Sequence, residues 1–136
     1  GFPFISLDMP QTFSKTQMFT YRTLFWWGHD LIFSLILKQE NLTPLIEKLI
    51  KLKDDSEWQN IHLATTLTPW EWENNTNNYI LLTKTSKIKL RKTLETLQYI
   101  KLCRFHPLNH PEFAELSWPN EGLANWNILS KVCADL

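Results

Sequence analysis

Residues 19–37 constrain the fold more than any other part of this chain. Two apolar runs lie on either side of Gly28-His29-Asp30, and Arg22 interrupts the first run. A helix that spans a membrane needs roughly 18 or more consecutive apolar residues, and these runs are shorter. As one helix the stretch would be apolar nearly all round, which suits only a fully buried helix. The sequence therefore predicts no membrane span here.

Two strands explain the same stretch better than one helix. Residues 19–27 and 31–37 each have an ordinary strand length, and their aromatic and β-branched residues favour strands. Gly28 tolerates the positive φ that a tight turn requires, and Asp30 is a common turn residue. The pattern favours a β-hairpin, with a buried helix as the alternative.

Helix and strand patterns alternate along the rest of the chain. The clearest helix is 44–53, because Thr43 can cap it, Pro44 suits its first turn, and leucine and isoleucine recur every three or four residues. A second helix is expected after Ser86, although 79–92 can also pair as a hairpin. The other expected elements are an extended lead-in at 1–16, strands at 58–67, 79–84 and 99–105, a loop at 68–78, a short piece at 113–118 and a terminal helix from Asn120.

This order of elements predicts an α+β or α/β domain. We expect one mixed sheet of about five strands with two or three packed helices, including a C-terminal helix. The 136 residues suit one domain, 1–136, with its own core. The chain begins with Gly1 and no Met, and its apolar start (GFPFI) indicates a segment cut from a longer protein or a first strand tied into a sheet.

Charge and residue usage exclude several functional classes. Lys plus Arg and Asp plus Glu number 14 each, and a net charge of zero argues against a strong non-specific nucleic-acid binder. With three glycines and no GxGxxG or GxxxxGK[ST] pattern, the chain has no phosphate-binding loop, and we expect no cofactor. Cys103 and Cys133 make no disulfide framework and favour a reducing, cytoplasmic location.

Histidines supply the candidates for metal binding and catalysis. Cys103, His106 and His110 have side chains that zinc prefers, but no CxxC pair accompanies them, so no metal site is predicted. His29 beside Asp30, with His62 or His106 from elsewhere in the chain, would suit general-base catalysis. The simpler interpretation is that Gly-His-Asp turns the chain.

Aromatic and basic residues supply two further candidate surfaces. Trp58, Trp70 and Trp72 lie around the Asn-rich loop, and aromatic rings stack on bases. A basic run that could hold phosphates follows them, although Glu71 and Glu73 would repel phosphate. The run consists of Lys84, Lys87, Lys89, Arg91 and Lys92.

Seven tryptophans in one short chain favour a binding surface for another protein, because Trp buries a large area at little rotamer cost. The candidate anchors are Trp26, Trp27, Trp70 and Trp72. We therefore expect a non-enzymatic domain that binds a partner protein as a subunit, adaptor or neutralising partner. The alternative is a small hydrolase or nucleic-acid-binding domain that uses a histidine set and the basic run 84–92.

Overall fold

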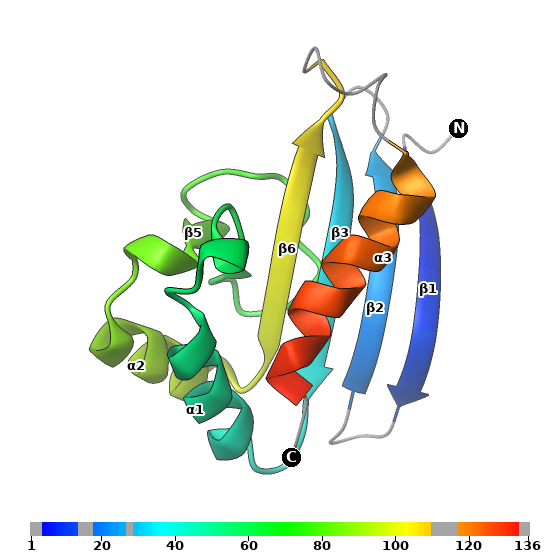
Figure 1. Cartoon of the computed structure of the whole chain (residues 1–136). Helices are drawn as coiled ribbons and strands as arrows, with labels where there is room; N and C mark the ends of the chain where they lie inside the picture. The colour runs from blue at the N-terminus through cyan, green and yellow to red at the C-terminus, as the bar shows by residue number, and fades with distance from the viewer. Residues whose placement is uncertain (1–3, 14–17, 27–28, 110–116, 134–136) are drawn as a thin grey trace.

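The computed structural model describes the backbone of residues 4–13 and all atoms of residues 18–26, 29–109 and 117–133. Within these residues one sheet has six strands in the order β1-β2-β3-β6-β4-β5 (Figure 1). The strands are β1 (Phe4–Phe13), β2 (Met18–Trp26), β3 (Asp30–Lys38), β4 (His62–Ala64), β5 (Tyr79–Leu81) and β6 (Ile100–Pro107), and the helices are α1 (Thr43–Leu52), α2 (Lys87–Leu97) and α3 (Trp118–Leu129). The expected α+β class with a C-terminal helix is confirmed.

The sheet is antiparallel rather than mixed, and it has one strand more than expected. β6 lies between β3 and β4 and is antiparallel to both. The connection from β3 through α1 to β4 therefore does not place two parallel strands side by side. The additional strand is β1, which pairs with β2 where we expected an extended lead-in. β1 covers an edge of β2 that would otherwise present nine residues of unpaired backbone.

The hairpin predicted for 19–37 is confirmed, and the buried-helix alternative is wrong. β2 and β3 pair in one register, from Met18 opposite Lys38 to Trp26 opposite Asp30. The His29 N–H donates a hydrogen bond of 3.0 Å to the Trp26 carbonyl, which joins the two strand ends. Every residue of 31–37 is buried because β3 is a central strand covered on both faces, and this explains its continuous apolar sequence.

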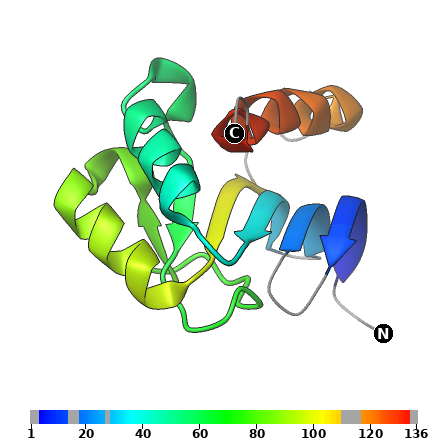
Figure 2. The same cartoon turned by 90° about the horizontal axis from the view of Figure 1, so that it is seen from below.

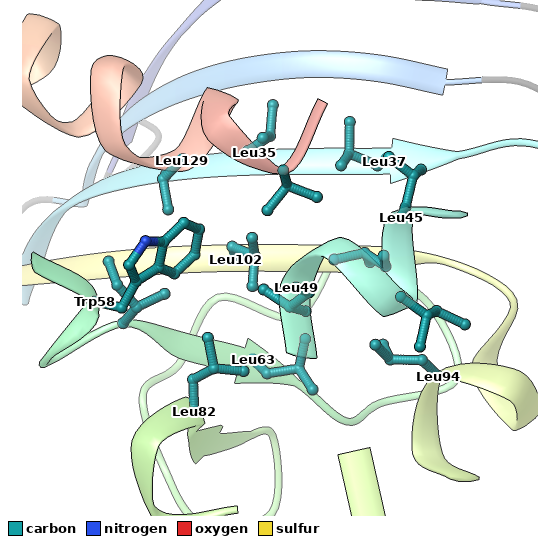
Figure 3. Packing of buried hydrophobic residues seen from close by; sticks show 14 of the residues in the cluster. Leu35, Leu37, Leu45, Leu49, Trp58, Leu63, Leu82, Leu94, Leu102 and Leu129 are labelled. Carbon is teal, nitrogen blue, oxygen red and sulfur yellow. The ribbon is translucent and has the colours of Figure 1, made fainter. Parts of the chain in front are cut away.

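Different kinds of structure cover the two faces of the sheet. α1 and α3 lie on one face, and the segment between β4 and β5 (residues 65–78) passes over the other (Figure 2). The helix-covered face carries the larger hydrophobic cluster, where leucines of α1 and α2 pack with those of β3 and β6 (Figure 3). Trp58, which we had considered as a stacking residue, is fully buried in this cluster.

The helix predicted at 44–53 is confirmed as α1, with a different cap. Leu45 and Leu49 are buried against the sheet, as the spacing predicts. The helix begins at Thr43, and the Thr43 N–H donates to Oδ1 of Asn41 at 3.1 Å. The side chain that satisfies the first turn is therefore Asn41 rather than Thr43.

Two strands are shorter than predicted. Within 58–67 only β4 forms a strand. A short 3-10 turn, η1 (Ser56–Trp58), and Asn60, whose φ of 64° is a left-handed conformation outside the strand region, precede it. Within 79–84, β5 is followed by a second 3-10 turn, η2 (Leu82–Lys84). Both departures place tightly turned backbone where the apolar pattern suggested a continuous strand.

The second and third helices are present, with differences at their ends. Ser86 caps α2 by accepting a hydrogen bond of 3.1 Å from the Lys89 N–H, so the alternative hairpin at 79–92 is wrong. α3 begins at Trp118 rather than Asn120, and Pro119 lies in its first turn. A 3-10 turn, η4 (Ser130–Cys133), continues α3. Most of the short piece predicted at 113–118 lies outside the described residues.

Candidate functional site

An apolar groove lies between α2 and the start of the 65–78 segment. Its volume is about 740 Å³, and its apolar wall residues are Leu67, Ile80 of β5, and Ile88 and Leu97 of α2. Leu67 is 88% exposed and Ile88 is 76% exposed, the two largest values among the exposed large hydrophobic side chains of the described residues. We call this hollow the α2 groove.

The local sequence explains why Ile88 is exposed. Leu90 and Leu94, four residues apart, form the buried stripe of α2. Ile88 lies outside that stripe and begins a second one, followed at four-residue intervals by Lys92 and Thr96, all of which line the α2 groove. The helix thus presents one apolar side to the core and a partly apolar side to the groove.

The charged side chains that line the α2 groove are both cationic. They are Lys89 and Lys92, which are exposed. Arg91 points elsewhere, because its guanidinium donates hydrogen bonds of 3.0 and 3.1 Å to the carboxylate of Glu47 on α1. These hydrogen bonds lower the pKa of Glu47 and raise that of Arg91. The basic run predicted at 84–92 is therefore divided, with Arg91 paired to α1.

Buried polar side chains of β6 and of Tyr99, which directly precedes it, hold the 65–78 segment that supplies Leu67. Lys101 is fully buried, and its Nζ donates hydrogen bonds of 2.7 Å to the Pro69 carbonyl and 2.9 Å to the Glu71 carbonyl. Burial lowers the pKa of Lys101 to about 8. The Tyr99 hydroxyl contacts the carbonyls of Thr66 and Thr68. These contacts fix the segment although it has no regular structure of its own.

The predicted tryptophan anchors lie in different environments. Trp70 is 46% exposed, with the Arg22 guanidinium 5.4 Å from its ring centroid. Trp72 is half-buried, and its ring lies over the ammonium group of Lys101 at 3.4 Å. Trp26 is half-buried and stacks on His29 at the hairpin end, with ring centroids 4.2 Å apart. Trp27 lies outside the described residues.

Of the candidate catalytic histidines, His29 and His106 are not brought together, whereas His62 and His106 line one hollow. His106 packs against Phe33, which belongs to the helix-covered cluster, with ring centroids 5.7 Å apart. His29 stacks on Trp26, which belongs to the cluster of the other face. Burial raises the pKa of Asp30, and neighbouring His29 opposes that effect. The two histidines therefore lie on opposite faces of the sheet, and His110 lies outside the described residues.

A second hollow, of about 580 Å³, lies beside the end of β6. Its lining includes His62, Arg104 and His106. Burial lowers the pKa of both histidines, which favours their neutral form. The terminal nitrogen of Arg104 donates to the carbonyls of Glu57 and Gln59 at 3.1 and 3.0 Å. That guanidinium is thus bonded to the chain's own backbone.

The candidate metal ligands are also separated. Cys103 is buried in the cluster of the loop-covered face, whereas His106 packs on the helix-covered face. Across the described ranges no three His, Cys, Asp or Glu side chains are placed to hold a metal ion together.

Sequence reasoning missed Leu67 and Ile88, the most exposed large hydrophobic residues of the groove. The signal that could have found Ile88 is its position off the Leu90–Leu94 stripe of a predicted helix. Leu67 carried no comparable signal, because 58–67 was interpreted as a strand.

No helix among the described residues has the length and apolar character needed to cross a membrane.

Comparison with known proteins returned no relative. A scan against family models, a search of curated proteins and a search of solved structures each found no match for this chain. Its function must therefore be inferred from the geometry of its own residues.

Proposed function

We propose that this chain is a non-enzymatic protein-binding domain that takes a segment of another protein into the α2 groove. The observation that carries the proposal is the exposure of Leu67 (88%) and Ile88 (76%) on the walls of one hollow. Contiguous exposed apolar surface with a polar rim is typical of interaction sites. The free cysteines Cys103 and Cys133 are consistent with a cytoplasmic protein.

The anchors in this proposal are mainly aliphatic, in contrast to the tryptophans expected from the sequence. Trp70 keeps a part in it, because it lies three residues after Leu67 in the same anchored segment and is 46% exposed. Trp26 and Trp72 are less suited, since each is half-buried and stacked on a neighbouring side chain. Trp70 remains our predicted aromatic contact for the partner.

The alternative functions receive less support. A hydrolase would need histidines that converge on one substrate, and His29 and His106 lie on opposite faces of the sheet. His62 and His106 line one hollow, but the Arg104 guanidinium beside them is bonded to the chain's own backbone. A single-strand nucleic-acid surface would need aromatic rings among the lysines. The rings of Trp70 and Trp72 instead lie over Arg22 of β2 and Lys101 of β6.

The test removes the apolar anchors and follows capture of a partner. The double variant Leu67→Ser, Ile88→Ser should fold normally, because both side chains are largely exposed. Immobilised wild-type chain and variant are compared for the proteins that they retain from an extract of the source cells, identified by mass spectrometry. We expect a protein that binds the wild type and is lost with the double variant.

The matched control is Leu123→Ser. Leu123 is 59% exposed on α3 and does not line the α2 groove. The Leu123→Ser variant should retain the same partner as the wild type. A partner that is lost equally with Leu123→Ser, or kept by the double variant, would contradict binding in the α2 groove.

A further inference from the structure

We propose that the segment bound in the α2 groove is an acidic amphipathic helix. This inference rests on the proposed function and adds the chemistry of the partner. It follows from the charges around the groove and from the way in which the neighbouring backbone is already hydrogen-bonded.

The charges of the α2 groove favour an acidic partner. Lys89 and Lys92 are the charged residues of its lining, and both are exposed. Ser86, the cap of α2, also lines the groove and brings the positive end of the helix dipole to its rim. Carboxylates at this rim would therefore find cations and no lining carboxylate to repel them.

The neighbouring sheet edge offers little to an added strand. β5 has three residues and is the last strand of the sheet. The Tyr79 N–H already donates to the Asn75 carbonyl at 3.0 Å, and the Leu81 carbonyl accepts from the Thr85 hydroxyl at 2.8 Å. A peptide that adds to a sheet edge gains affinity from main-chain hydrogen bonds. With these two backbone groups already bonded, a partner here gains little from main-chain pairing and would bind mainly through its side chains, as a helix does.

The spacing of the groove residues fits a helix. The walls offered by Leu67 and Ile88 suit apolar anchors that recur every three or four residues along one face of a partner helix. Lys89 and Lys92 are one turn apart on α2, about 4.5 Å along its axis. Two glutamates three or four residues apart, next to the apolar face of the partner, have a similar spacing and can meet both lysines.

The test uses three synthetic peptides of about 18 residues, long enough to form a helix. They share one pattern of leucines on one face and carry glutamate, glutamine or lysine at the flanking positions. Binding to the whole chain is followed by fluorescence anisotropy of a label on the peptide. We expect the glutamate peptide to bind at least about 10-fold more tightly than the lysine peptide, with a difference that shrinks as salt is added.

A charge exchange makes the test specific for the groove. In the variant Lys89→Glu, Lys92→Glu the preference should reverse, so that the lysine peptide binds more tightly. The matched control is Lys48→Glu, Lys51→Glu on α1, which has the same spacing and the same change in net charge outside the groove. The control should keep the preference for the glutamate peptide.

The outcomes separate the two proposals. If the glutamate and glutamine peptides bind equally and Leu67→Ser, Ile88→Ser abolishes both, the acidic chemistry is wrong while the binding groove stands. If the glutamate peptide shows no saturable binding up to about 1 mM, the proposal of an acidic helix is wrong. The capture experiment with the cell extract then tests separately whether the α2 groove binds a protein. A third outcome is that the chain binds phosphatidylserine vesicles through Lys89 and Lys92 but binds none of the peptides. The ligand of the groove would then be a membrane surface, and the proposal of a protein partner would be wrong.

Discussion

The two faces of the sheet are covered by different means. On one face, α1 and α3 place apolar side chains on β3 and β6, in a cluster that includes Leu49 and Trp58 (Figure 3). The 65–78 segment lies on the other face (Figure 2). It is held by side chains that donate hydrogen bonds to its backbone, among them Lys101 and Tyr99. Apolar packing is non-directional, whereas these hydrogen bonds fix individual carbonyl groups.

The two faces should contribute to different properties, one to the stability of the fold and the other to the binding surface. The helix-covered face should supply most of the free energy of unfolding, because it buries most of the aliphatic side chains. The loop-covered face should set the positions of Leu67 and Trp70, the exposed large hydrophobic side chains of the 65–78 segment. Changes on the first face should therefore lower global stability, and changes on the second should alter local order.

The largest expected effect is on the helix-covered face. Leu49→Ala removes a fully buried side chain of α1 and should lower the free energy of unfolding by about 2–5 kcal/mol. Urea denaturation monitored by circular dichroism measures the change. Ile88→Ala, on the exposed side of α2, is the control and should stay within about 0.5 kcal/mol. A loss below about 0.5 kcal/mol for Leu49→Ala would show that α1 is peripheral to the core.

A smaller effect is expected where Tyr99 holds the loop. Tyr99→Phe removes the hydroxyl that contacts the carbonyls of Thr66 and Thr68 and should cost about 1–2 kcal/mol. Amide hydrogen exchange in 65–78 should become faster. The control on the other face is Tyr21→Phe, which removes a hydrogen bond of 2.7 Å to the Gly122 carbonyl. If Tyr99→Phe leaves exchange in 65–78 unchanged, the hydroxyl does not anchor the segment.

The pH dependence of stability should report the burial of Lys101. Its pKa is lowered to about 8 in the folded chain, below the value near 10.4 of an unfolded lysine. Between these values the unfolded chain binds more protons, so stability should rise with pH through this window. The rise should approach about 1 kcal/mol between pH 8 and pH 9, and it is measured by urea denaturation at each pH.

The matched variant for this measurement is Lys101→Met. Burial also raises the pKa of Cys103 and Tyr99, and deprotonation of these groups in the unfolded chain lowers stability at higher pH. Subtracting the pH curve of Lys101→Met from that of the wild type removes most of this opposing effect. A flat difference curve from pH 8 to pH 9 would show that folding does not lower the pKa of Lys101.

The elements that depend on local sequence could be predicted. The hairpin of β2 and β3, helix α1 and the Ser86 cap of α2 each follow from turn residues, capping or apolar spacing within a few residues. The strand predicted at 58–67 is shortened to β4, because the apolar pattern of its first part is shared by a 3-10 turn that buries Trp58 in the core. Periodicity alone does not separate a short buried strand from other buried segments.

The candidate site was largely beyond sequence reasoning, because it depends on contacts between distant residues. Lys101 meets the carbonyls of Pro69 and Glu71 across about 30 positions of the chain, and nothing in the local sequence indicates that pairing. The α2 groove forms only because α2 lies beside Leu67, and that placement also depends on contacts between distant residues. Among the three predicted tryptophans that the structure describes, Trp70 alone is exposed, and the sequence predicted a loop at its position.

The smallest effect on stability is expected at Trp70, where the loop-covered face meets solvent. Trp70→Ala removes a ring that is 46% exposed and packs on the Arg22 guanidinium, so it should change the free energy of unfolding by about 0.5 kcal/mol. The half-buried ring of Trp72 contacts Lys101, so Trp72→Ala should cost clearly more. If Trp70 contacts the partner, its removal should also weaken association by about 2 kcal/mol or more, measured by titration calorimetry with the captured protein. Unchanged affinity would confine the interface to the α2 groove, and a stability loss as large as that of Trp72→Ala would make Trp70 part of the loop's own packing.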